Sequence, residues 1–127
     1  MLLKKNSKEI FNEEVAYRAG MNGKGVFQIV GTAPEPQYVW DKDNRKYTDE
    51  VSGYGIWVRQ SDGEYQQNPI MVVIPNISEN KANDFQFGDF VKLKNFGGYY
   101  SRKKHVYRWQ ADSIYKDKEE TNNVKSI

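Results

Sequence analysis

The chain has 127 residues, a formal net charge of +2 and no cysteine. This length predicts a single domain, and the lack of thiols excludes disulfides, thiolate metal sites and cysteine nucleophiles. The N-terminus has no apolar signal-peptide core. The longest apolar run, at residues 70–74, is too short to cross a bilayer. We therefore expect a soluble, cytoplasmic protein that does not engage the membrane.

Residues 1–25 permit two interpretations. Asn6 and Glu9 have the spacing of a capping box, which predicts a short helix that ends at Gly20. The same segment is compatible with a strand around residues 14–18. The pattern does not decide between them.

The rest of the chain predicts strands. Nine Tyr, six Phe and three Trp favour this state, because flat side chains fit a pleated, half-buried surface. The turn at residues 41–44 predicts a hairpin, and the run at 70–74, apolar on both faces, predicts a central strand. Residues 78–88 form a polar connection that allows a helical turn, and Gly97-Gly98 joins the last two strands. The expected strands are residues 26–32, 37–40, 45–48, 54–60, 70–74, 89–95 and 103–111. Short strands separated by turns in this way predict an all-β barrel or sandwich.

Alternation along three of these strands separates a buried face from an exposed one. The inward set is aliphatic or aromatic, whereas the outward set combines cations with rings. We expect inward Ile56, Val58, Val91, Leu93, Tyr107, Trp109 and Ala111. We expect outward Trp57, Arg59, Phe90, Lys92, Lys94, Lys104, Arg108 and Gln110, with Tyr99 and Tyr100 in the adjacent loop.

Charge is unevenly distributed along the chain. The first 63 residues contain nine cations and nine acids, but residues 90–111 contain cations and no acid. A basic cluster on a nearly neutral chain indicates a local anionic partner. The members of this cluster are Lys92, Lys94, Arg102, Lys103, Lys104 and Arg108.

Cations with exposed rings are typical of single-stranded nucleic-acid sites. Lys and Arg neutralise phosphates with counterion release, and aromatic faces stack unpaired bases at about 1–3 kcal/mol each. Only single strands offer free base faces. We expect the six cations of the basic cluster to contact phosphates and Trp57, Phe90, Tyr99 and Tyr100 to stack bases, with Arg59 in either role.

Two simpler interpretations stay open. Cations on an edge strand block sheet-to-sheet aggregation without binding anything. Alternatively, the N-terminal segment covers Trp57 and Phe90, which would remove both rings from the surface.

Catalysis has no support in the sequence. His105 is the only histidine, and its combination with Ser101 and Asp112 lacks a nucleophile elbow. The glycines of residues 20–25 do not form a P-loop. We expect no enzyme activity, no metal and no cofactor.

The second half of the chain resembles a known family. The segments are VRQSDGEYQQNPIMVVIPN, FQFGDFVKLKN and RWQADSI, within residues 54–114. They are similar to small accessory proteins of Gram-positive integrative and conjugative elements, a family that includes a helicase processivity factor. One departure is Asn95-Phe96-Gly97, where the family pattern often has Asn-Pro.

The resemblance implies an OB-like β-barrel that binds single-stranded DNA and helps a host helicase unwind element DNA during replication and transfer. The expected fold is therefore all-β, a small and partly open Greek-key barrel of five strands. We expect a barrel at residues 26–114, an N-terminal segment at 1–25 and a flexible polar tail at 115–127.

Other functions are not excluded by the sequence. A protein-interaction adaptor would bind helicase or relaxase through the same rings and never contact DNA. A transcriptional regulator would prefer duplex DNA, although no helix-turn-helix pattern is present.

Overall fold

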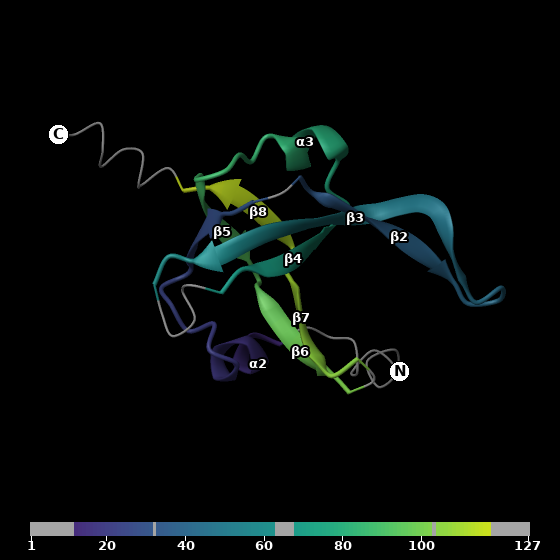
Figure 1. Ribbon diagram of the computed structural model, residues 1–127, viewed down its shortest axis with the longest axis horizontal. Helices are drawn as coiled ribbons and strands as arrows, with labels where there is room; N and C mark the ends of the chain where they lie inside the picture. Colours follow the sequence, from purple (N-terminus) through teal and green to yellow (C-terminus); the bar gives the residue numbers. More distant parts are fainter. Residues whose placement is uncertain (1–11, 32, 63–67, 103, 118–127) are drawn as a thin grey trace.

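The structure is a computed structural model that describes residues 12–31, 33–62, 68–102 and 104–117. These residues form two short helices and one eight-stranded sheet, joined by turns and loops (Figure 1). The helices are α2 (Glu13–Arg18) and α3 (Glu79–Asn83). The strands are β1 (Val26–Ile29), β2 (Glu35–Asp41), β3 (Lys46–Gln60), β4 (Ile70–Pro75), β5 (Phe90–Lys94), β6 (Gly97–Ser101), β7 (Val106–Gln110) and β8 (Ser113–Lys116).

The strand order is β6-β7-β4-β3-β1-β5-β8, with β2 paired to β3 beside this path. The β4–β7 pair is parallel and the other pairs are antiparallel. The predicted β-rich class is therefore confirmed. Among the described strands, however, β6 and β8 end the order without pairing to each other, so the OB-like barrel stays a prediction.

One continuous segment connects the two sides of this sheet. β7 pairs with β4, and β8, which begins after only Ala111 and Asp112, pairs with β5. The backbone N–H of Ala111 donates to the carbonyl of Val73 on β4 at 3.1 Å. The N–H of Asp112 donates to the carbonyl of Lys94 on β5 at 2.8 Å. The sheet therefore curves enough for a single chain segment to contact both β4 and β5.

The core lies on the inner face of this curved sheet. Burial alternates along β1 and β4, as the two-residue period of a strand requires. The central place predicted for residues 70–74 is confirmed, because β4 lies between β3 and β7. The buried apolar side chains of the strands and their flanks are Phe27, Ile29, Ile56, Val58, Ile70, Val72, Ile74, Val91, Trp109, Ala111 and Ile114.

The described part of the N-terminal segment contains a helix, α2. Asn12 caps it, because its side-chain oxygen accepts from the N–H of Glu14 at 2.7 Å and from Val15 at 3.4 Å. Ala16 faces the core and is buried, and Gly20 follows the helix with a φ of 95°. The helical interpretation is confirmed at residues 13–18, while the predicted capping box at Asn6 lies outside the described residues.

Strand β6 was not expected, because Gly97-Gly98 was predicted to join two strands. Gly98 pairs with Trp109 on β7, and a Cβ at Gly98 would lie 2.7 Å from two atoms of the indole ring. Gly98 therefore leaves space for the indole ring of Trp109 and does not form a turn between two strands. The following strand consequently begins at Val106 and not at residue 103.

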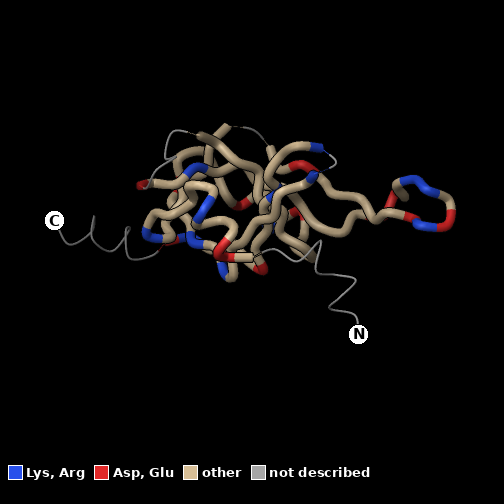
Figure 2. The backbone as a smooth tube through the Cα atoms, turned by 90° about the horizontal axis from the view of Figure 1, so that it is seen from below, with Lys and Arg blue, Asp and Glu red and all other residues tan. Residues whose placement is uncertain are grey.

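The β2–β3 hairpin is longer than predicted. The expected strands at 45–48 and 54–60 are one 15-residue strand, β3, and the predicted turn at 41–44 is confirmed. Figures 1 and 2 show this hairpin projecting from the body of the molecule. We call its projecting part, residues 38–51, the arm.

The chain stays in the sheet further than predicted at its C-terminal end. Tyr115 and Lys116, the first residues of the predicted tail, pair with Lys92 and Val91 on β5. The N–H of Asp117 also donates to the carbonyl of Phe90 at 2.9 Å. The remainder of the predicted tail lies outside the described residues.

Candidate nucleic-acid interface

Seven of the predicted contact residues lie on the outer face of the sheet, opposite the core. Along each strand they alternate with residues that are buried or packed against the core, so their own side chains point away from it. All except the exposed Lys94 are half-buried. The seven are Trp57, Arg59, Phe90, Lys92, Lys94, Tyr99 and Arg108.

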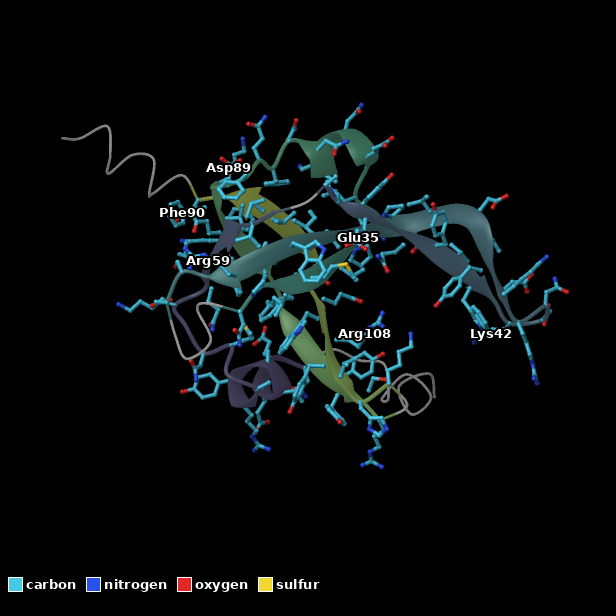
Figure 3. All side chains as sticks on the ribbon, in the orientation of Figure 1. Glu35, Lys42, Arg59, Asp89, Phe90 and Arg108 are labelled. Atoms are coloured by element: carbon cyan, nitrogen blue, oxygen red, sulfur yellow. The ribbon has the colours of Figure 1, made fainter. Side chains whose placement is uncertain are left out.

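One cross-strand row on this face joins a cation to a ring. Arg59 on β3 pairs with Gln28 on β1, and Gln28 pairs with Phe90 on β5. Nε and Nη2 of Arg59 donate to Oε1 of Gln28 at 3.2 and 2.7 Å. Nε2 of Gln28 donates to the carbonyl of Gly88 at 3.2 Å. These bonds hold the guanidinium on Gln28, the residue that separates Arg59 from Phe90 in this row, and both residues lie toward the same end of β3 (Figure 3).

A second row crosses four strands. Trp57 on β3 pairs with Met71 on β4, and the parallel register of β4 and β7 places Arg108 level with Met71. Tyr99 on β6 then pairs with Arg108. The row therefore has a ring at each end, with a thioether and a guanidinium between them.

Strand β5 adds two cations to the outer face. Lys92 pairs with Val26 on one side and Tyr115 on the other. Lys94 pairs with Ser113 at the edge strand β8. Lysines on a strand beside a ring are the arrangement expected for phosphate contact next to a stacked base.

The turn between β6 and β7 carries the rest of the basic cluster. Arg102 and Lys104 are exposed there, at the end of the hairpin that bears Tyr99 and Arg108. Lys103 lies outside the described residues. The described cations of this turn thus lie beyond the Ser101–Val106 pair, along the hairpin from the second row.

Tyr100 and Tyr107 are not part of the outer face. They pair across the β6–β7 hairpin on the side opposite Tyr99, with ring centroids 5.1 Å apart. The core position predicted for Tyr107 is wrong, because its ring stacks on Trp109 at 5.7 Å and stays 45% exposed. The loop position predicted for Tyr100 is also wrong, since it lies on β6.

Rings link this exposed pair to the core. Tyr107 stacks on Trp109, Trp109 on Phe96 at 5.7 Å, and Phe96 contacts Phe27 at 5.1 Å. Five rings therefore run from Phe27 to Tyr100 along the inner side of the hairpin. They anchor the hairpin whose other side carries Tyr99 and Arg108.

Glu35 is a functional candidate that the sequence did not reveal. Nε1 of Trp57 donates to Oε2 of Glu35 at 2.6 Å, a short, charge-assisted bond. The register of β2 on β3 causes this contact, because Glu35 pairs with Gly55, two residues from Trp57. The only local signal is the pair of prolines that flank Glu35, which predicts a loop and no partner.

Glu35 and Trp57, which are hydrogen-bonded to each other, both line one pocket. Its volume is about 310 Å³, and most of its lining is apolar. Two residues after β1 and one residue before β4 complete the wall. We call this site the Trp57 pocket; its lining residues are Val30, Gly31, Glu35, Trp57 and Pro69.

Acidic groups also border the outer face. Asp89, just before Phe90, forms an ion pair with Lys116 at 3.7 Å, and both Asp89 and Glu35 are visible near the outer-face residues (Figure 3). Charges of both signs alternate at the tip of the arm (Figure 2). The cations of the arm, Lys42, Arg45 and Lys46, therefore lie among acids, whereas the cations of β5 and the β6–β7 hairpin lie in a segment, residues 90–111, that contains no acid.

Helix α2 packs on β6 and lines a pocket with Phe27, Leu93 and Phe96 on the inner side of the sheet. The described part of the N-terminal segment therefore lies on the core side. Trp57 and Phe90 both keep partial exposure.

Comparison with protein-family models, with curated proteins and with solved structures gives no match for this chain. Neither described helix has the length and apolarity that a bilayer span requires. What the site does must therefore be argued from its own geometry.

Proposed function

We propose that this chain is a non-enzymatic accessory factor that binds single-stranded DNA on its outer face. One observation carries the proposal: two adjacent rows, Arg59–Gln28–Phe90 and Trp57–Met71–Arg108–Tyr99, place rings beside cations on one face. Rings give sequence-tolerant stacking and cations give phosphate neutralisation. A duplex keeps its bases stacked inside the helix and so offers these rings no free base faces.

The strand connections support an OB-like barrel as the finer description of the fold. β1, β3 and β4 form an antiparallel meander, α3 separates β4 from β5, and β5 returns to pair with β1. The segment from β7 to β8 contacts both β4 and β5. An OB-type barrel uses one sheet face and its loops for oligonucleotides, which corresponds here to the outer face and its flanking hairpins.

The helicase role rests on the family resemblance of residues 54–114. A protein that holds one separated strand prevents reannealing behind a helicase, which is the assistance that replication and transfer of a conjugative element require. The proposed partners are single-stranded DNA and a host helicase, with relaxase as a further candidate.

The test is fluorescence anisotropy with a labelled single-stranded oligonucleotide. Arg59→Glu combined with Arg108→Glu should weaken binding at least tenfold, because each reversal removes a phosphate contact and adds repulsion. Lys42→Glu combined with Lys81→Glu, two exposed reversals on the arm and α3, changes the net charge by the same amount; it is the matched control and should bind as the unmodified chain does. Equal binding by all three proteins would contradict the proposal.

A second candidate function is favoured by the arm. Tyr38 pairs with Val51 and Trp40 with Tyr47, so these four side chains share one face, and each is at least 40% exposed. Exposed apolar patches of this kind mark protein-interaction sites. An adaptor would bind purified host helicase through this face and give no oligonucleotide signal at low salt.

A further inference from the structure

We infer that the Trp57 pocket is a base-selective subsite that takes guanine from a bound strand. The inference deepens the proposed function and rests on it. It starts from one contact, the hydrogen bond from Trp57 Nε1 to Glu35 Oε2 at 2.6 Å. A carboxylate is an unexpected group on a phosphate-binding surface, so its role needs a separate explanation.

The pocket has the size and surface of a site for one base. At about 310 Å³ it lies at the lower limit of small-ligand sites, which run from about 300 to 1,000 Å³. Val30, Gly31 and Pro69 provide apolar contact surface, and Trp57 provides the ring for stacking. Stacking on an aromatic ring is sequence-tolerant by itself, so selectivity must come from the polar group.

The bond to Trp57 fixes where that polar group lies. The indole N–H points along the ring plane, so it holds the Glu35 carboxylate at the edge of the ring. A base stacked on the ring face then has its own edge within reach of the carboxylate. An ionised carboxylate has two oxygens with about four acceptor positions, and the indole N–H uses one of them.

Guanine is the base whose edge matches such an acceptor. Its Watson–Crick edge presents two adjacent donors, N1–H and the N2 amino group, which suit a carboxylate in a bidentate, charge-assisted arrangement. Adenine and cytosine each present a single amino donor next to a ring-nitrogen acceptor. Thymine presents one N–H between two carbonyl acceptors, and an anion repels acceptors.

The surrounding charges favour a base over a phosphate in this pocket. The Glu35 carboxylate repels a phosphate, whereas Arg59 follows Trp57 by two residues on the same face and Arg108 lies in the same row. The phosphates of a bound strand are therefore expected at these guanidinium groups, outside the pocket, and the carboxylate in the pocket faces a base. Base recognition would thus explain why a carboxylate lies on a surface that otherwise carries cations.

The test uses four oligo-dT strands that differ only in one central base, G, A, C or T, measured by anisotropy at low salt. The strand with G should bind roughly tenfold tighter, since a good bidentate pair discriminates by about 1–3 kcal/mol. Glu35→Gln should remove this preference and leave binding of the all-T strand intact, because its amide oxygen still accepts from Trp57 but its amino group opposes guanine donors. Glu79→Gln, an exposed carboxylate on α3, is the control and should keep the preference.

A second measurement separates failure of this inference from failure of the proposed function. The indole N–H signal of Trp57, assigned with Trp57→Phe in a ¹⁵N–¹H spectrum, should shift with guanosine monophosphate and not with the other three monophosphates. Equal affinity for all four strands, with an equal response to all four monophosphates, would overturn the guanine site and leave strand binding standing. A guanine-specific shift without strand binding would overturn the proposed function and keep the pocket as a guanine site. No response in either assay would overturn both.

Discussion

At the scale of single residues, a glycine determines how the aromatic rings of the β6–β7 hairpin pack. Gly98 leaves space for the Trp109 ring, and Trp109 in turn carries the stack that leads to Tyr107. The outer side of the same hairpin holds Tyr99 and Arg108. A methyl group at residue 98 therefore affects the geometry of the proposed interface as well as the core.

Gly98→Ala should lower the free energy of unfolding by about 1–3 kcal/mol, the usual cost of overpacking. The reason is that its Cβ would lie 2.7 Å from the indole ring of Trp109. Chemical denaturation measures the change. In a Trp109→Leu background the same substitution should cost less, and an equal cost in both backgrounds would show that the ring contact is not the cause.

Asp41 at the tip of the arm should titrate below its ordinary pKa of 3.8, because the Asn44 side chain donates to its Oδ2 at 2.7 Å and lowers the pKa. A lowered folded pKa means that this contribution to turn stability is present above the ordinary pKa and is lost as pH falls through the folded value. Carboxyl NMR titration measures it. Asn44→Ala should return the pKa toward 3.8, and an unchanged pKa would contradict the assignment.

At the scale of elements, local patterns predict much of the sheet, but not its long-range contacts. The turn at 41–44 and the alternation of Ile56 and Val58 could be read from the sequence, since both depend on neighbouring residues. Glu35 could not, because its contact with Trp57 depends on how β2 pairs with β3. Nor could β6, because a glycine pair under a ring looks the same in sequence as a glycine pair in a turn.

The side chains of the arm should contribute little to the free energy of unfolding of the molecule. Trp40 and Tyr47 contact each other at 4.8 Å and are 47% and 63% exposed, so replacing both with Ser should change the free energy of unfolding by less than about 1 kcal/mol. Oligonucleotide binding should persist in this variant if the outer face is the site. Loss of oligonucleotide binding would instead assign that function to the arm.

At the scale of the whole molecule, one curved sheet separates two surfaces with different composition. Its inner face holds the apolar core and α2, and its outer face combines cations with half-buried rings. The sequence predicted which residues alternate outward. It did not predict that the register of β4 and β7 brings Arg108 into one row with Trp57, because a parallel pairing leaves no local signal.

The central claim is that this outer face holds unpaired DNA, and titration with single- and double-stranded DNA at two salt concentrations tests it most directly. We predict tighter binding to the single strand and a steep loss of affinity as salt rises, with the slope reduced by about 0.7 for each phosphate contact removed by mutation. Preference for the duplex, or no binding to the single strand at low salt, would contradict the account.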